Sequence, residues 1–245
     1  MRHHWIRGAG LAAGLGAAIL LAVAFTAALE SRSYNVWGAM LVVPLVVLAN
    51  VLLLTKATAR EDDPWVARLI WLAFAAKVAA TGARYVMAYV LYGGSSDAER
   101  YNRYAAWEYL RWRRGEITLQ TLDVSGTQWL EMVTTAIYTV VGPSPITGFF
   151  VFASFAFWGT YFFYRAFRIA LPEGDTRRYA LLVFLLPSLL FWPASIGKES
   201  WLLLFFGLTA FGVAWFFAAD GHGLIDMALG AAGTAVLRPH LAVLT

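Results

Sequence analysis

Charged residues and cysteine are scarce in this chain, and each scarcity excludes a class of protein. Only 14% of the 245 residues are charged, whereas 60% are hydrophobic and 16% are aromatic. A soluble domain has about 25% charged and about 45–50% apolar residues. The absence of cysteine excludes a disulfide framework, a thiolate metal site and a cysteine nucleophile. The composition therefore excludes an ordinary soluble enzyme, a disordered protein and a nucleic-acid-binding domain.

The basic residues are few and dispersed. The formal net charge of +4 arises from 19 Lys and Arg spread along the chain. A dispersed positive charge fits a membrane protein better than a nucleic-acid-binding surface, which needs a concentrated basic patch. We therefore expect the lipid bilayer as a partner and no nucleic acid. The sequence gives no indication of an oligomeric state.

Long apolar runs occupy much of the sequence. A spanning helix needs about 20 predominantly apolar residues, so about seven of them would use a little over half of the chain. No run alternates as a barrel strand does, so we predict an all-α, polytopic membrane protein with about seven transmembrane helices. The apolar runs are Leu11–Leu29, Gly38–Thr55, Val66–Tyr92, Trp129–Val141 (which is short), Ile146–Tyr164, Tyr179–Trp192, Ser200–Ala218 and Leu224–Thr245.

The organisation expected is a single transmembrane domain over residues 1–245. A cleaved signal peptide is the alternative for the first run, which is long for one. Because the sequence stops at Thr245 inside an apolar run, we expect an N-terminal fragment of a longer protein. The Lys and Arg of the short loops place the N-terminus in the cytoplasm and residues 93–128 in an extracytoplasmic loop, although five arginines in that loop oppose this orientation. The expected location is the inner membrane of a bacterium.

Two basic residues lie inside the third expected span. A basic side chain at a helix centre costs about 2.5–3.5 kcal/mol, so Lys77 and Arg84 need a reason to be there. They are seven residues apart and share one helical face. Either they reach the membrane surface or pair with buried acids, or they line a polar site. The second interpretation is favoured for Arg84, whose face leads into the next polar motif, and both remain open for Lys77.

A polar motif follows the third span and begins a helix. Ser96 and Glu99 have the spacing of an N-capping box. Asp97 falls in the first helical turn, where the helix dipole stabilises a carboxylate. On a helix, Asp97 shares one face with Tyr101 and Tyr104, and arginines share the adjoining face. The arginine face predicts an interfacial amphipathic helix, and the other face predicts a site.

Two further motifs place charge beside helix-breaking prolines. Lys198 and Glu199 lie at a bend that follows Pro193, between two expected spans. A tight turn with a surface ion pair is the alternative interpretation there. Arg238 and His240 flank a proline within the last apolar run, where polar groups are costly unless they face a polar cavity.

The expected topology brings the outer ends of several segments together. Four charged residues are expected there, namely Arg84, Asp97, Lys198 and Arg238. Guanidinium and ammonium groups bind phosphate oxygens through charge-assisted hydrogen bonds. We therefore predict one composite pocket for an anionic ligand such as a phosphate or pyrophosphate headgroup. The histidines indicate no metal site.

The acidic motif also carries a family resemblance. The stretch DAERY, which opens a helix after a hydrophobic span, resembles the first extracytoplasmic loop of GT-C glycosyltransferases, in which a modified Asp-x-Asp motif supplies a catalytic carboxylate. The segments LPSLLFWPASIGKES and VLRPHLA resemble those of bacterial membrane proteins related to such transferases or to polysaccharide polymerases. Here the motif follows the third expected span, whereas the GT-C pattern usually places it after the first.

The resemblance implies a glycosyltransferase that uses a polyprenyl-phosphate-linked sugar at the outer face. Asp97 would be the catalytic general base that deprotonates an acceptor hydroxyl, and Arg and Lys would bind the phosphate. No cofactor is indicated with certainty, although Glu99 is the candidate ligand for a divalent cation. The residues expected to bind substrate are Lys77, Arg84, Tyr101, Tyr104, Lys198, Glu199, Arg238 and His240.

Two other classes of protein fit the same residues. A transporter or flippase for an anionic or lipid-linked substrate would also need buried charges and proline-broken helices, but it predicts a sequence repeat that the chain does not show. A non-catalytic membrane subunit would use the charges to pair with partner helices. Replacing Asp97 separates these classes, because an enzyme loses turnover whereas a subunit loses assembly.

Overall fold

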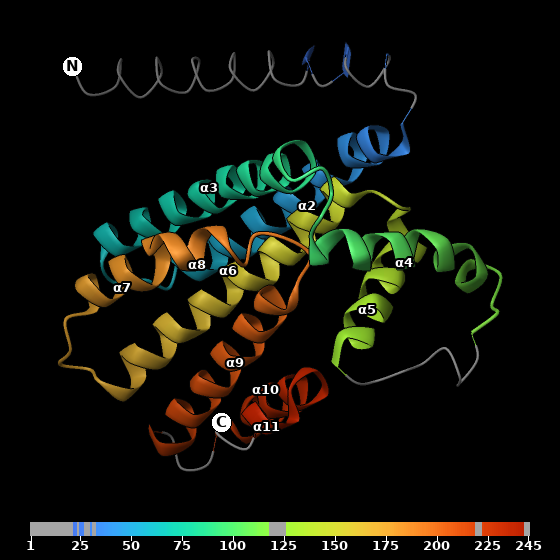
Figure 1. Cartoon of the computed structure of the whole chain (residues 1–245). Coiled ribbons are helices and arrows are strands. Elements are labelled where there is room, and N and C mark those ends of the chain that lie inside the picture. Colours follow the sequence, from blue (N-terminus) through green and yellow to red (C-terminus); the bar gives the residue numbers. More distant parts are fainter. Residues whose placement is uncertain are drawn as a thin grey trace, which may run out of the picture.

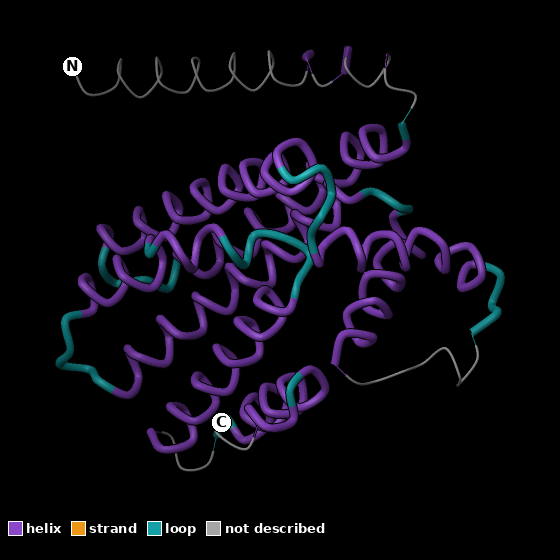
Figure 2. The backbone as a smooth tube through the Cα atoms, in the orientation of Figure 1, coloured by secondary structure: helices purple, strands orange, loops and turns teal. Residues whose placement is uncertain are grey.

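The computed structural model describes residues 33–117, 126–218 and 222–242, together with 22, 23, 25, 26 and 30. Over these residues the secondary structure is helical, as predicted. Figures 1 and 2 show a bundle of long helices, with two further helices that extend from one of its ends. The long helices are α2 (Tyr34–Thr58), α3 (Pro64–Val86), α6 (Pro145–Ala170) and α9 (Lys198–Ala218). The others are η1 (Met87–Leu91), α4 (Asp97–Arg113), α5 (Gly126–Val141), α7 (Thr176–Leu185), α8 (Pro187–Phe191), α10 (Leu224–Leu237) and α11 (Pro239–Ala242).

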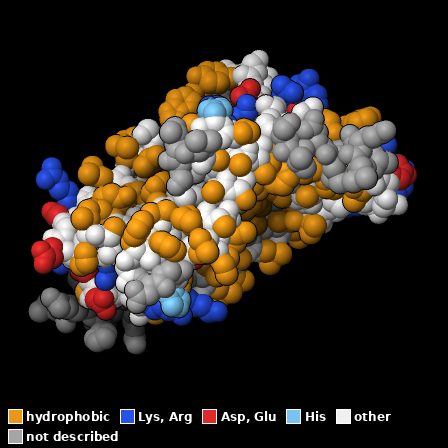
Figure 3. Space-filling view, turned by 90° about the horizontal axis from the view of Figure 1, so that it is seen from below, with side chains coloured by type: hydrophobic (Ala, Val, Ile, Leu, Met, Phe, Trp, Pro, Cys, Tyr) orange, Lys and Arg blue, Asp and Glu red, His pale blue; other side chains and the backbone are white. Residues whose placement is uncertain are grey.

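Four described helices are long and apolar enough to cross a membrane. They are α2, α3 with its continuation η1, α6 and α9. Large apolar side chains on α2 face outward, and Leu41 and Leu45 are 70% and 63% exposed. Hydrophobic side chains also cover much of the face in Figure 3, with charged groups nearer its edges. An exposed apolar surface of this kind suits a lipid environment, so the structure supports the prediction of a membrane protein.

The prediction of about seven spans is not confirmed. The run Tyr179–Trp192 divides into α7 and α8, of 10 and 5 residues. Leu186 between them is extended, with φ −58° and ψ 121°, because the ring of Pro187 disfavours the helical conformation of the preceding residue. Pro187 thus interrupts this run, and α8 contacts α3 rather than extending α7.

The remaining expected spans are short or not described. The run Trp129–Val141 is part of α5, which has only 16 residues. The last run forms α10, of 14 residues, and ends before Pro239 because proline cannot continue the helix. Its final residues 243–245 lie outside the described residues, as does most of the expected first span Leu11–Leu29.

Small residues allow the central helices to approach closely. A Cβ atom added to Gly159 on α6 would meet the backbone of Leu203 on α9, and one added to Gly207 would meet Gly159. In the same way, Gly212 on α9 lies against the backbone of Met227 on α10. Helices in a membrane gain stability from this close packing because apolar side chains gain little by leaving lipid. The result is a rigid α6–α9–α10 unit that fixes the position of the first turn of α9.

The bundle has two chemically different ends. We call one the ion-pair end; it consists of the loop 59–63, the C-terminus of α6 and the N-terminus of α7. There Arg168 pairs with Glu61 at 2.8 Å, and Arg177 pairs with Asp63 at 2.6 Å. We call the other the cavity end, where η1, the start of α4 and the start of α9 meet. The described part of the expected extracytoplasmic loop that begins α4 therefore lies at the opposite end of the bundle from the loop 59–63.

Candidate functional site

The first wall of the site comes from the junction between α3 and α4. The last turn of α3 widens into the π-helix η1, and π-helical turns often occur at functional sites. Gly93 and Gly94 then reverse the chain with φ angles of 56° and 81°, a left-handed conformation that glycine adopts without steric cost. This turn places Ser96 and Asp97 at the start of α4, beside the end of α3 that carries Arg84.

The second wall is the segment between α8 and α9. Residues 193–197 are buried, and the Ser200 hydroxyl contacts two of their carbonyl oxygens, at 3.0 Å from Pro193 and 2.7 Å from Ser195. The indole of Trp201 donates to the carbonyl of Gly233 on α10 at 2.8 Å. These contacts anchor the start of α9, so Lys198 and Glu199 are presented from a fixed backbone.

The two walls enclose a charged cavity of about 260 Å³. Its lining residues are Arg84, Ser96, Asp97, Ala98, Trp192, Ser195, Ile196, Gly197, Lys198 and Glu199. Three of the four residues predicted to share a pocket, Arg84, Asp97 and Lys198, are therefore brought together. Glu199, which was predicted to bind substrate, joins them.

The charged groups of this cavity have few partners of their own. The guanidinium of Arg84 lies over the rings of Phe191 and Trp192, at 5.6 and 5.0 Å from their centroids. Its Nε atom and the Ser96 hydroxyl are both buried without a hydrogen-bond partner. Among the described residues, Arg84, Asp97, Lys198 and Glu199 are absent from the ion pairs within 4.0 Å. Buried polar groups without partners are uncommon, and here both face a space that a ligand can fill.

The predicted N-capping box is not formed. The Ser96 side chain makes no capping hydrogen bond. Glu99 instead accepts a hydrogen bond from Asn102 at 2.9 Å and lies 3.6 Å from Arg103. The i,i+3 and i,i+4 neighbours thus compete successfully for the Glu99 carboxylate. The Ser96 backbone N–H, which the Glu99 carboxylate would bind in a capping box, instead donates to the Gly94 carbonyl at 2.8 Å. The Ser96 hydroxyl has no hydrogen-bond partner, and Ser96 lines the charged cavity.

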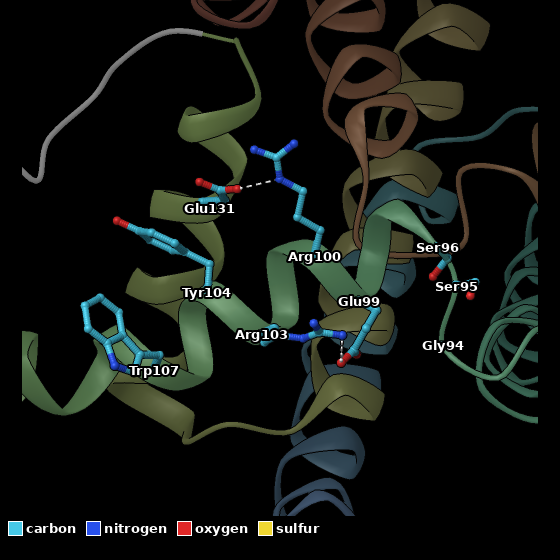
Figure 4. A pocket seen from close by; sticks show the side chains of 9 residues that line it. All are labelled: Gly94, Ser95, Ser96, Glu99, Arg100, Arg103, Tyr104, Trp107 and Glu131. Atoms are coloured by element: carbon cyan, nitrogen blue, oxygen red, sulfur yellow. Dashed lines mark hydrogen bonds and ion pairs between the residues drawn. The ribbon is translucent and has the colours of Figure 1, made fainter.

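A second hollow adjoins the charged cavity on the other side of α4. We call it the aromatic groove; its volume is about 720 Å³. Figure 4 shows its lining, which consists of Gly94, Ser95, Ser96, Glu99, Arg100, Arg103, Tyr104, Trp107 and Glu131. Glu131 of α5 is buried and pairs with Arg100 of α4 at 3.0 Å. Since Ser96 lines both hollows, the charged cavity and the aromatic groove meet at the start of α4.

The two predicted tyrosines have different positions. Tyr104 lines the aromatic groove, whereas Tyr101 is only 1% exposed and packs in the core behind the charged cavity. Burial, together with the nearby negative charges of Asp97 and Glu199, raises the pKa of Tyr101 to about 12. Tyr101 therefore remains a neutral phenol that supports the cavity wall.

Lys77 does not line the charged cavity. Its ammonium group donates hydrogen bonds to the carbonyl oxygens of Leu189 and Leu190, at 2.8 and 3.0 Å. Those carbonyls belong to α8, whose five residues leave most of its backbone acceptors without helical partners. Lys77 thus bonds to backbone carbonyls rather than to a buried acid, and it fastens α8 to α3.

Arg238 and His240 also lie apart from the charged cavity. Both are exposed, and neither is among the residues that line the cavity. Arg238 ends α10 with φ −146° and ψ 86°, since the following Pro239 prevents a helical conformation. The expectation that Arg238 shares the pocket of Asp97 is therefore wrong.

Several residues of these hollows were not predicted from the sequence, and three of them shape the site. Trp192 provides the ring beneath Arg84, Glu131 holds Arg100, and Trp107 borders the aromatic groove. A signal existed for Glu131, which is a single acid in an otherwise apolar helix. For Trp192 and Trp107 the sequence offered none, because aromatic residues are common throughout the chain.

Over residues 33–117, 126–218 and 222–242, no three His, Cys, Asp or Glu side chains gather as a metal site requires. Glu99 is thus not part of such a group, and its two partners are Asn102 and Arg103. Comparison of the chain with protein-family models, curated proteins and solved structures finds no match. The two hollows at the cavity end are therefore the features of this chain that point to a function.

Proposed function

We propose that this protein is a membrane glycosyltransferase that uses a lipid-linked sugar as donor at its cavity end. The observation that carries the proposal is the charged cavity, in which Arg84 and Lys198 of two candidate spans meet the carboxylates of Asp97 and Glu199. Among the described residues, none of these four side chains has an ion-pair partner within 4.0 Å. A lipid-linked sugar phosphate has the matching chemistry, because its headgroup is anionic and its tail is soluble in the bilayer. The resemblance of the DAERY motif to GT-C enzymes points to the same class.

Arg84 and Lys198 are the proposed phosphate ligands. Both side chains line the cavity, and Arg84 has a buried Nε atom without a partner. Lys198 is the first residue of α9, so the positive end of a 21-residue helix dipole adds to its charge. The unpartnered Ser96 hydroxyl is available as a further donor. These groups stabilise the negative charge that the departing polyprenyl phosphate gains.

Asp97 is the proposed general base. Its carboxylate accepts the proton of an acceptor hydroxyl while the oxygen of that hydroxyl forms a bond to the anomeric carbon of the sugar. The bond between that carbon and the phosphate oxygen breaks, and the electron pair leaves with the polyprenyl phosphate. Asp97 is exposed at the start of α4 and is not the N-cap residue of that helix, so its carboxylate is accessible to an acceptor.

The aromatic groove is the proposed site for the acceptor saccharide. It meets the charged cavity at Ser96, and its lining combines the rings of Tyr104 and Trp107 with carboxylates and guanidinium groups. Trp107 is 68% exposed, so its ring is accessible to a ligand. Sugar-binding sites need both apolar rings and polar groups that receive hydroxyls. An acceptor lying in this groove would present its hydroxyl at the start of α4.

The decisive variant is Asp97→Asn, with Asp226→Asn as a matched control. Both aspartates lie in the first turn of a helix, but only Asp97 lines the charged cavity. General-base catalysis is worth about 10²- to 10⁴-fold in rate, so we expect a loss of that size in sugar transfer from a polyprenyl-phosphate donor for Asp97→Asn alone. Donor binding and membrane insertion should persist in both variants. Equal activity of the two variants would contradict the proposed role of Asp97.

The broken pair α7–α8 favours a second candidate, a flippase for the same class of lipid. Proline-interrupted helices near a charged cavity are a feature of transporters. Proteoliposomes separate the two candidates, since a flippase moves the lipid-linked sugar between leaflets without consuming it. Loss of assembly with a partner protein after Asp97→Asn would instead favour a non-catalytic subunit.

The proposed location is the bacterial inner membrane, with Leu11–Leu29 as the candidate for a further span.

A further inference from the structure

A third hollow lies toward the ion-pair end, between three of the candidate spans. Its volume is about 800 Å³, and its lining comes from α2, α6, α9 and the loop after α2. Rings from α6 and α9 provide apolar walls, among them Trp158, Phe211 and Trp215. Three basic side chains border the hollow: Lys56, Arg60 and Arg165. We call this hollow the basic groove.

The cations of the basic groove differ from their neighbours at the same end. Arg168 and Arg177 are neutralised by Glu61 and Asp63, at 2.8 and 2.6 Å. Among the described residues, no acid lies within 4.0 Å of Lys56, Arg60 or Arg165. Within the part of the chain that the structure describes, the one hydrogen bond of these three side chains is donated by Arg165 to the Tyr161 hydroxyl at 3.3 Å. Because Glu61 and Asp63 pair with Arg168 and Arg177, the positive charge of the basic groove is not neutralised by the loop 59–63.

We propose that the basic groove binds one anionic phospholipid. The phosphate of the headgroup would lie among Lys56, Arg60 and Arg165, and an acyl chain would lie along the aromatic walls. Charge complementarity selects an anionic headgroup, and basic pockets between transmembrane helices are known to bind such headgroups. The apolar walls argue for a lipid rather than a free phosphate ion, which would leave them without an occupant. Because this groove and the charged cavity lie toward opposite ends of the bundle, the proposal does not rest on the proposed transferase activity.

The test compares two double variants of the full chain, purified in detergent and freed of lipid. Lys56→Gln/Arg165→Gln removes two groove charges, and Arg68→Gln/Arg178→Gln removes two exposed charges outside the groove at the same end. Native mass spectrometry would measure retention of phosphatidylglycerol and phosphatidylcholine with identical acyl chains. We expect the wild type and the control to retain phosphatidylglycerol at least about tenfold better, which corresponds to about 1.4 kcal/mol. The groove variant should show little preference.

Three outcomes would overturn the proposal. An equal loss of preference in both double variants would show that general surface charge attracts the lipid. A wild-type chain without preference, or one whose bound phosphatidylglycerol is displaced by millimolar inorganic phosphate, would show that the groove does not hold a whole lipid. The wild-type measurements do not depend on any variant folding, so they decide the question even if the groove variant is unstable.

Discussion

The two ends of the bundle contain similar charged side chains, but these side chains form ion pairs at one end and line a cavity at the other. At the ion-pair end, Arg168 and Arg177 meet the acids of the short loop 59–63 at hydrogen-bonding distance. At the cavity end, Arg84 and Lys198 share a cavity with two carboxylates and form no ion pair with them. A paired charge is already satisfied and holds the structure together. An unpaired charge that lines a cavity has its interaction energy available for a ligand, which is why the proposed function is placed at the cavity end.

The comparison predicts that the loss of a cation lowers stability at the ion-pair end and ligand binding at the cavity end. The largest effect on stability is expected for Arg168→Ala. The Glu61 side chain is 5% exposed and would lose its guanidinium partner. Leaving a buried charged acceptor unpaired costs about 2–3 kcal/mol. We expect a loss of that size in the free energy of unfolding in detergent. Because Tyr164 also donates to Glu61, the double variant Glu61→Gln/Arg168→Ala should recover part of the loss, and failure to recover any would place the effect elsewhere.

A smaller effect on stability is expected from Arg84→Gln/Lys198→Gln at the cavity end. Neither side chain has an ion-pair partner to abandon, and the contact of Arg84 with the Phe191 and Trp192 rings is worth about 0.5–1 kcal/mol. The free energy of unfolding should therefore change by less than about 1 kcal/mol. Retention of a polyprenyl phosphate, measured by native mass spectrometry, should fall at least about tenfold. Strong destabilisation without loss of retention would remove the distinction between the two ends.

The smallest effect is expected at the pair of Asp63 and Arg177. The hydrogen bond from Arg177 holds the pKa of Asp63 below its ordinary value, with a further contribution from the backbone of Trp65. A lowered pKa in the folded state stabilises the fold above the ordinary value of about 3.9, and this contribution is lost as the pH falls below it. Asp63→Asn retains a residue that can cap α3 but removes the charge.

We expect the melting temperature of Asp63→Asn to lie slightly below that of the wild type at pH 7. The difference should shrink as the pH falls through the lowered pKa, because the wild-type carboxyl then also becomes neutral. Differential scanning fluorimetry between pH 7 and pH 3 measures it. A difference that persists at the acid end would mean that the cap of α3, rather than the charge, is affected.

Much of the helical framework follows from the sequence. The expected runs Gly38–Thr55 and Ser200–Ala218 lie within α2 and α9, and the expected bend after Pro193 is present. Apolar length and proline act locally, so their consequences are visible in the chain itself. Four of the about seven expected spans are found among the described residues. Apolar composition alone did not show that α5 and α10 have only 16 and 14 residues, whereas a spanning helix needs about 20.

The site was partly predictable. Arg84, Asp97 and Lys198 were expected together because each lies at the outer end of an apolar run, and the structure places all three around one cavity. Arg238 satisfied the same criterion, but its position depends on how α10 packs and where that helix ends. The N-capping box of Ser96 and Glu99 was also predicted and is not formed. Whether the Glu99 carboxylate bonds to the backbone or to a neighbouring side chain depends on conformation.

The sequence by itself determined that the chain is helical and apolar, and that its scarce charges are concentrated in a few motifs. These properties depend on composition and on spacing over a few residues. Only the tertiary structure decided which charges are satisfied. Lys77 bonds to the carbonyls of α8, whereas Arg84, seven residues further along α3, reaches a cavity. The difference arises because helix packing brings hydrogen-bonding carbonyls of α8 to Lys77, whereas it brings the rings of Phe191 and Trp192 and a cavity to Arg84.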